Sequence, residues 1–160
     1  MTTTLQMPVP VSFEFFPPNT PVGSEKLKTV VAELAAKLQG DARIDALEGV
    51  NARHLDPATL PVQRYDLVVG DLSFISLTLV LPALAPMVGG TLLMLVKPQF
   101  ELQPADIGKG GLVKDPASFA RVEARIREAC AALKLHVTDW FESPIAGGDG
   151  NKEFFVRATP

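Results

Sequence analysis

Short runs of apolar residues punctuate the chain, and most are separated by longer segments in which apolar residues recur every three or four positions. The short runs have the length and the β-branched or aromatic content of strands. Strands are therefore predicted at residues 11–16, 44–47, 66–70, 91–96, 135–141 and 154–159. Because residues 91–96 are apolar without interruption, this strand is expected to be buried on both faces.

Helical spacing of apolar residues occurs in three of the intervening segments. Residues 24–38 begin with Ser24, a candidate N-cap, and residues 77–87 contain Pro82, which should bend or restart the helix. Residues 119–133 form the third amphipathic segment. This alternation predicts an open, mostly parallel α/β sheet of about six strands with helices on both faces. The last two strands have no helix between them, which favours an antiparallel pair at the edge of the sheet.

Glycine marks two connections. Gly89-Gly90 is expected to turn the chain into the strand at 91–96. The polar segment 101–117, which contains residues 108–111 (Gly-Lys-Gly-Gly), is too long for a simple connection and is expected to be functional or mobile. Its glycines lack the spacing of a phosphate-binding P-loop, so nucleoside triphosphate binding is not predicted.

Three of the predicted strands carry an ionisable side chain at one end. Asp71 follows strand 66–70, Lys97 follows strand 91–96, and Glu153 precedes strand 154–159. Buried parallel strands deliver such side chains to one edge of a sheet, where a carboxylate, an amine and a second carboxylate could transfer protons and stabilise charge. Plainer readings remain open: a helix N-cap for Asp71, a solvated strand end for Lys97 and an exposed edge position for Glu153.

Composition and charge narrow the classes of function. A chain of 160 residues with 47% hydrophobic content can bury the core of one domain. A formal net charge of −3 argues against a free-standing nucleic-acid binder. Cys130 is the only cysteine, which fits a reducing cytoplasm, and neither a signal peptide nor a membrane span is evident. His54 and His136 stand alone, so no metal site is expected.

From about residue 43 onward, six motifs follow one another in a fixed order. They are Leu-Glu-Gly-Val-Asn-Ala-Arg, Asp-Leu-Val-Val-Gly-Asp-Leu-Ser-Phe-Ile-Ser, Leu-Val-Lys-Pro-Gln-Phe-Glu, Ile-Gly-Lys-Gly-Gly-Leu-Val-Lys-Asp-Pro, Ser-Pro-Ile and Gly-Asn-Lys-Glu-Phe-Phe. Together they resemble the C-terminal part of the TlyA, or hemolysin-like, ribosomal RNA methyltransferases. That family belongs to the FtsJ-like group, which has a Rossmann-like sheet and uses S-adenosylmethionine to methylate ribose 2′-hydroxyls.

The resemblance implies a set of site residues. Asp71, Lys97 and Glu153 match three members of the family's Lys-Asp-Lys-Glu tetrad. Lys97 would then assist deprotonation of the 2′-hydroxyl, while Asp71 and Glu153 hold the lysine and the methyl acceptor. Cofactor contacts would come from Asp71 and from Asn51 and Ala52, although an Asx-type turn is the alternative reading of Asn51.

The long polar segment also contains two lysines. Lys109 and Lys114 are read as phosphate contacts or, equally, as solvated loop residues.

The N-terminal residues resemble a different family. Residues 11–18, Val-Ser-Phe-Glu-Phe-Phe-Pro-Pro, closely resemble the opening strand of methylenetetrahydrofolate reductase, a flavin-containing (β/α)₈ barrel in which the glutamate matching Glu14 is the catalytic acid. With one β/α unit of eight, neither a flavin nor a folate site can form. The junction between the two resemblances is placed at residues 38–41.

The chain is thus expected to be a single α/β domain, residues 1–160, made of a foreign segment (1–40) and a partial methyltransferase domain (41–160). The strand at 11–16 is expected to lie beside strand 66–70, in a place left by the family's first units.

This arrangement predicts impaired activity. Residues 17–21, which follow the first strand, include three prolines without N–H groups and cannot imitate the family's Gly-rich cofactor loop. The family's first catalytic lysine and its N-terminal RNA-binding domain also have no counterpart before residue 43. RNA binding is therefore expected to be weak or absent. The alternatives are a non-catalytic fusion remnant or interaction module and, less favoured, a reductase fragment; a homodimer is open.

Overall fold

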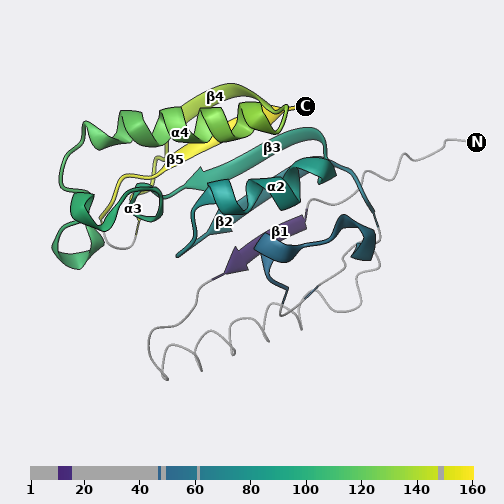
Figure 1. Cartoon of the computed structure of the whole chain (residues 1–160), viewed down its shortest axis with the longest axis horizontal. Coiled ribbons are helices and arrows are strands. Elements are labelled where there is room, and N and C mark those ends of the chain that lie inside the picture. The colour runs from purple at the N-terminus through teal and green to yellow at the C-terminus, as the bar shows by residue number, and fades with distance from the viewer. Residues whose placement is uncertain (1–10, 16–46, 48–49, 61, 148–149) are drawn as a thin grey trace, which may run out of the picture.

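A mixed five-stranded sheet organises the described part of the protein. The computed structural model describes residues 11–15, 47, 50–60, 62–147 and 150–160, and the sheet has the order β1-β2-β3-β5-β4 (Figure 1). The strands are β1 (Val11–Phe15), β2 (Tyr65–Leu72), β3 (Val88–Val96), β4 (His136–Glu142) and β5 (Phe154–Thr159). β1, β2 and β3 run parallel, whereas β5 is antiparallel to both β3 and β4.

The strand pattern confirms an open α/β sheet that ends in an antiparallel pair. β1 pairs with β2 from Val11 opposite Val68 to Phe15 opposite Leu72, so the predicted place of residues 11–16 beside strand 66–70 is confirmed. The predicted helix at 24–38 lies outside the described residues, as does most of the strand at 44–47.

Short helices connect the described strands, and only one of the described helices is long. The described α-helices are α2 (Leu81–Leu84), α3 (Pro98–Glu101) and α4 (Ser118–Ala132). The 3-10 turns are η1 (Ala52–His54), η2 (Pro57–Thr59), η3 (Leu77–Leu79), η4 (Ala85–Met87), η5 (Pro104–Asp106) and η6 (Lys109–Gly111). No helix of the described residues is long and apolar enough to cross a membrane.

The prediction of a helix over 77–87 that Pro82 bends or restarts is confirmed for the restart, since α2 begins at Leu81-Pro82, and is wrong for one continuous helix. This segment consists of η3, α2 and η4 in succession. Pro82 and Pro86 stand at the starts of α2 and η4, where the missing N–H groups cost little, but two prolines four residues apart leave no room for a continuous helix.

The prediction of a turn at Gly89-Gly90 is also wrong, because both glycines lie inside β3. A Cβ on Gly90 would come 2.4 Å from the carbonyl oxygen of Asp66, and one on Gly89 would come 3.1 Å from that of Tyr65. The register of β2 against β3 shifts between Tyr65 and Leu67, at the same place. Glycine is therefore used here for close approach of two backbones.

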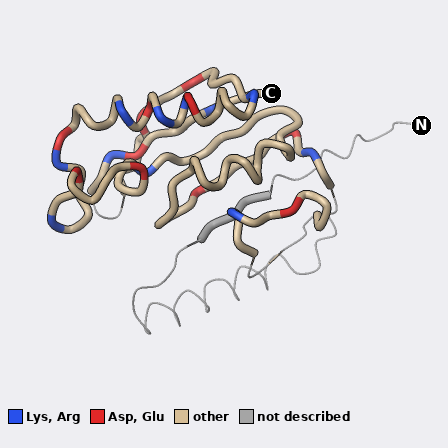
Figure 2. The backbone as a smooth tube through the Cα atoms, in the orientation of Figure 1, with Lys and Arg blue, Asp and Glu red and all other residues tan. Residues whose placement is uncertain are grey.

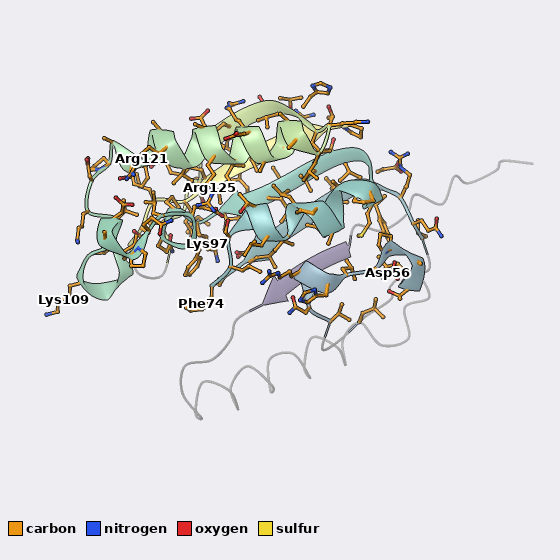
Figure 3. All side chains as sticks on the ribbon, in the orientation of Figure 1. Asp56, Phe74, Lys97, Lys109, Arg121 and Arg125 are labelled. Atoms are coloured by element: carbon orange, nitrogen blue, oxygen red, sulfur yellow. The ribbon has the colours of Figure 1, made fainter. Side chains whose placement is uncertain are left out.

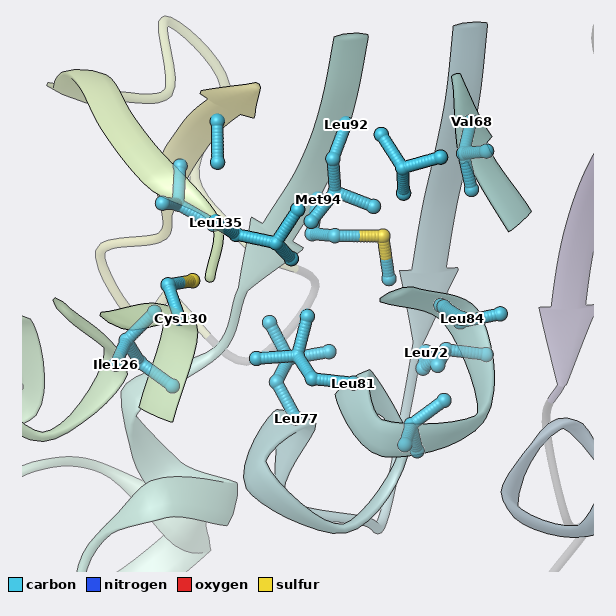
Figure 4. Packing of buried hydrophobic residues seen from close by; sticks show 14 of the residues in the cluster. Val68, Leu72, Leu77, Leu81, Leu84, Leu92, Met94, Ile126, Cys130 and Leu135 are labelled. Carbon is cyan, nitrogen blue, oxygen red and sulfur yellow. The ribbon is translucent and has the colours of Figure 1, made fainter. Parts of the chain in front are cut away.

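The core lies between one face of the sheet and the helices α2 and α4 (Figure 4). The buried positions on this face alternate along the strands: Val68 and Leu72; Leu92, Met94 and Val96; Phe154, Val156 and Ala158. On the other face of β3, Leu95 is buried and Leu93 is partly buried, so burial on both faces is confirmed for the end of this strand. From α4, Val122, Ile126 and Cys130 recur every four residues and are at most 1% exposed. Each such large side chain contributes about 1.5–3 kcal/mol on burial. Helices were expected on both faces, and the described ones, α2 and α4, cover the same face.

Candidate functional site

The ends of β2 and β3 bring Asp71 and Lys97 together. The strands are parallel with Asp71 opposite Leu95, so Ser73 and Lys97 leave the sheet side by side. Lys97 Nζ lies 2.6 Å from Asp71 Oδ1 and donates to Ser73 Oγ at 2.9 Å. The Lys97 side chain is only 9% exposed, which rules out a freely solvated strand end. A buried ammonium needs such partners, because an unpaired charge in the interior is very costly.

Asp71 is an internal residue of β2, since this strand extends two residues beyond the predicted end at 70. Ser76 caps the following turn η3, so the N-cap interpretation of Asp71 is wrong. The oxygen that faces Lys97 is buried, although the side chain as a whole is 41% exposed. One part of the carboxylate therefore holds the lysine, and the rest is open to a ligand.

Glu153 reaches the same edge from β5. The β3–β5 register pairs Val96 with Phe154, and continuing it by one residue sets Glu153 opposite Lys97. Glu153 is 8% exposed, so the interpretation as an ordinary exposed edge residue is wrong. The connection from β4 folds closely over it: a Cβ on Gly147 would come 2.7 Å from Glu153 Oε1, and Ser143 N donates to the Glu153 carbonyl at 2.8 Å.

Asn151 fastens the long loop to this edge. Its side chain is buried at 3% exposure, donates from Nδ2 to the carbonyl of Gly111 at 2.9 Å and accepts from Val113 N at 3.0 Å. The loop itself closes through a bridge between Ile107 and Val113. Two residues before Glu153, one amide thus fixes a glycine-rich loop that comes about 40 residues earlier in the sequence.

An aromatic pair flanks Lys97 at the surface. Phe74 has a left-handed backbone, with φ of 63°, and its side chain is 53% exposed. Its ring centroid lies 4.9 Å from that of Phe100. Figure 3 shows Phe74 beside Lys97 where β2 and β3 end. Positive φ is rare for a bulky residue and concentrates at functional sites.

Asn51 and Ala52 are not shown to join the Asp71–Lys97 cluster. Asn51 Oδ1 accepts from Arg53 N at 3.0 Å and caps η1, the Asx-type arrangement that the sequence left open. η1 contacts α2 on the core side of the sheet. Asn51 is exposed and keeps its amide N–H groups available, so cofactor contact stays a prediction for both residues.

The lysines of the long loop differ from each other. Lys109 is exposed and projects from the tip of the loop (Figure 3), whereas Lys114 Nζ donates to the carbonyl of Ala105 at 2.9 Å. Basic and acidic residues alternate along the loop and α4 (Figure 2). Arg121 bonds Asp106 at 2.7 Å, and this hydrogen bond is the main cause that holds the pKa of the Asp106 carboxyl below its ordinary value.

Sequence reasoning missed four contributors: Ser73, Phe74, Glu101 and Asn151. All four lie inside the quoted motifs, but nothing in the spacing of their neighbours indicates a role. Glu101 is 3% exposed, and burial raises the pKa of its carboxyl. For Glu101, the one available signal was a charged residue one helical turn after Lys97.

Comparison with known proteins identifies the family of the chain. Residues 28–159 match the model of the FtsJ-like methyltransferases. The chain is 42% identical over 126 residues to the 16S/23S rRNA (cytidine-2′-O)-methyltransferase TlyA of Mycobacterium tuberculosis, covering 78% of this chain and 47% of that protein. It is 40% identical over 127 residues to YqxC of Bacillus subtilis, named as an rRNA methyltransferase, covering 78% of this chain and 45% of that protein.

A solved structure gives the same result in three dimensions. A hemolysin-like protein from Streptococcus thermophilus superposes with a TM-score of 0.72 at 35% identity, over 77% of this chain and 45% of that one. The chain therefore spans about half the length of the relatives it matches. The matched range begins at residue 28, inside the segment whose sequence resembles the reductase. The match over residues 28–159, together with these relatives, establishes that the chain belongs to the FtsJ-like methyltransferase family.

Proposed function

We propose that this chain serves methyl transfer from S-adenosylmethionine to a ribose 2′-hydroxyl of ribosomal RNA, at the edge formed by Asp71, Lys97 and Glu153. The observation that carries the proposal is a lysine of 9% exposure lying 2.6 Å from Asp71, with Glu153 opposite it in the strand register. A fold has no structural need for this arrangement, because an apolar residue would fill the same place at lower cost.

The residues present fit the cofactor in part. The exposed part of Asp71 can accept hydrogen bonds from a ligand next to Lys97, and Asn51 offers an exposed side-chain amide. The place of the family's Gly-rich loop, after the first strand, is taken in the sequence by residues 17–21, which include three prolines and lie outside the described part of the chain. When bound, the cofactor supplies an electrophilic methyl group on a sulfonium centre.

In the proposed reaction, the protein's own groups bind and orient the acceptor. Lys97 Nζ, held between Asp71 and Ser73, meets the 2′-hydroxyl and assists removal of its proton as the oxygen attacks. Asp71 and Glu153 fix the lysine and keep the local charge balanced. The exposed ring of Phe74 offers a face on which a base of a single-stranded RNA segment can stack.

A second reading is a non-catalytic remnant or interaction module. Its support is the segment 17–21, directly after β1, in which three prolines lack the N–H groups that a cofactor-binding turn donates. In this reading residues 1–40 derive from a reductase-like sequence and supply β1 as a substitute strand, and the site is inherited but impaired. A cytoplasmic location belongs to both readings. A homodimer belongs to both as well, since large apolar patches seldom stay exposed to solvent.

Two measurements separate the readings. Titration calorimetry with S-adenosylmethionine should give heat of binding with a dissociation constant in the micromolar to millimolar range, and labelled methyl groups should enter ribosomal RNA. Silence in both experiments would favour the remnant. A yellow preparation with bound flavin would instead revive the reductase fragment; we expect a colourless one.

A further inference from the structure

We infer that Glu101 is a positioning residue that sets the place of Lys97 by clamping together the loops that leave β2 and β3. The inference rests on the proposed function for its catalytic meaning, but its structural content can be tested independently. Glu101 is one of the buried charged residues of the described chain, at 3% exposure, and it lies one turn of α3 after Lys97.

Two hydrogen bonds join the Glu101 carboxylate to the loop after β2. Oε1 accepts from Leu77 N at 2.7 Å, and Oε2 accepts from Ser76 Oγ at 2.5 Å. Both oxygens are thus occupied by protein donors at the start of η3. Because the carboxylate is buried and engaged on both sides, it holds protein to protein and does not touch a substrate.

These bonds form the last of three successive links between the same two loops. Lys97 donates to Ser73, the ring of Phe100 packs on that of Phe74, and Glu101 binds Ser76 and Leu77. The links follow the chain in the same direction on both loops. The position of the Lys97 side chain between the loops therefore depends on the hydrogen bonds that Glu101 makes.

Arg125 extends the clamp to α4. Its Nη1 donates to the backbone carbonyl of Glu101 at 2.6 Å, and its Nη2 lies 3.4 Å from Thr78 Oγ1. Thr78 Oγ1 in turn lies 2.7 Å from Ser76 Oγ. The polar contacts form a closed circuit through Glu101, Ser76, Thr78 and Arg125, so three separate elements share one network. Figure 3 shows Arg125 above Lys97 at this end of the sheet.

The clamp also explains how a phenylalanine keeps a left-handed backbone. Phe74, with φ of 63°, lies between Ser73, fixed by Lys97, and Ser76, fixed by Glu101. Such a conformation persists only where the surroundings determine it on both sides. Release of the Ser76 side should let the loop relax, which would move both the Phe74 ring and the hydroxyl that holds Lys97.

The test compares Glu101→Ala with Glu101→Gln. Alanine removes both acceptors, whereas a glutamine can accept from Leu77 N and donate to Ser76 Oγ, which keeps the clamp without the charge. Glu123→Ala is the matched control, since Glu123 is a surface carboxylate paired with Arg127 on α4. Ser76→Ala is the milder variant in case Glu101→Ala does not fold.

The structural readout is amide hydrogen exchange, followed by NMR, in the parent chain and each variant. In Glu101→Ala, exchange at Leu77 and its neighbours in the loop should accelerate about tenfold or more, while β4 and β5 keep their protection. Ser76→Ala should give a smaller change in the same residues, and Glu101→Gln and Glu123→Ala should match the parent. Unchanged exchange at Leu77 in Glu101→Ala, or acceleration spread evenly over the sheet, would overturn the inference.

The catalytic readout is steady-state methyl transfer. Glu101→Ala should lower kcat about 10- to 100-fold, because small misplacement of a reacting group is costly, and leave the KM for S-adenosylmethionine within about twofold. Glu101→Gln should restore kcat. If Glu101→Ala keeps the parent's kcat, Glu101 does not position Lys97. If the parent itself transfers no methyl group, the proposed function fails, and the exchange experiment alone decides the clamp.

Discussion

The described part of this chain contains pairs of like side chains, one buried at the site and one at the surface, that bind the same kind of partner but differ sharply in burial. Lys97 and Lys152 both contact a carboxylate, at 2.6 and 2.9 Å, but they are 9% and 56% exposed. Asn151 and Asn51 both accept a backbone N–H at 3.0 Å, the first buried and the second exposed. Similar distances therefore say little about energy; burial decides what each contact contributes.

The difference separates two purposes. The inner members, Lys97 and Asn151, bind groups far apart in the sequence and converge on one edge of the sheet. The outer members bind neighbours along the chain or across one hairpin. Buried polar groups cost more to place than exposed ones, so their gathering at a single edge indicates a function that an apolar cluster could not perform.

The strongest test of the comparison is Lys97→Met. We expect methyl transfer to fall at least about 100-fold, because the group proposed to meet the acceptor hydroxyl is gone. The free energy of unfolding should drop modestly, by about 1–2 kcal/mol, since Asp71 remains partly solvated. Labelled-methyl incorporation into ribosomal RNA and urea unfolding measure the two effects. Activity equal to the parent would show that the buried lysine is only structural.

The second test is Asn151→Ala. Loss of the amide leaves the Gly111 carbonyl and the Val113 N–H without their partner, which should cost about 1–3 kcal/mol of stability. Limited proteolysis should now cut first in the loop around residues 107–113. Asn51→Ala is the control, with an expected loss of about 1 kcal/mol or less for an exposed cap. Equal losses in the two variants would contradict the comparison.

The third test uses pH. Burial raises the pKa of Glu101 in the folded protein above its ordinary value of 4.5, so the folded state holds this proton more tightly than the unfolded chain does. Ionisation of Glu101 therefore lowers stability as the pH rises from about 4.5 through the folded-state pKa. Across this window, the stability of Glu101→Gln should improve relative to the parent, as measured by urea unfolding at several pH values.

Asp106 supplies the opposite sign for the pH test. Its hydrogen bond to Arg121 lowers the pKa of its carboxyl, so its contribution to stability is present above the ordinary value of 3.8 and is lost as the pH falls through the folded-state pKa. Asp106→Asn should therefore differ from the parent mainly above pH 4. If the free energy of unfolding, relative to the parent, changed with pH in the same direction in the Glu101 and Asp106 variants, burial would not distinguish the two carboxyls.

The smallest expected effect belongs to Lys152→Met. Its ion pair with Glu142 is exposed on both sides, and such pairs are worth about 0–1 kcal/mol. Stability should change by less than about 0.5 kcal/mol, and methyl transfer should match the parent. A large loss of activity would show that Lys152 belongs to the functional site, and that exposure does not separate functional from non-functional polar groups here.

Much of the architecture follows from local pattern. The apolar runs located all five described strands, and the handedness of β-helix-β crossovers placed residues 11–16 beside strand 66–70. The same reasoning brought Asp71 and Lys97 to one edge, because parallel strands end together. These features depend on periodicity and chain direction, which a single sequence records directly.

The failures share a different cause. Gly89 and Gly90 were predicted to form a turn. Glycine is required at these positions because the backbone of β2 approaches closely, and this contact exists only after β3 has paired with β2. Asn151 finds its partners 38 and 40 residues away, and Glu101 finds its own 24 and 25 residues away, with no periodic signal between them. Contacts that form only in the assembled fold produce no periodic pattern among residues adjacent in the sequence, so they could not be predicted from it.

The strand order has a consequence for how the protein is made. β5 comes after β4 in the chain but lies between β3 and β4 in the sheet. On a ribosome, β4 therefore emerges with no strand to pair with, and its stack of Trp140 on Phe154 must wait for β5. Glu153 arrives with that same last strand, so the cluster of Asp71, Lys97 and Glu153 cannot form on a nascent chain before the sheet is complete. Until β5 pairs with it, β3 presents an unpaired edge. A chaperone would protect the chain most during this interval.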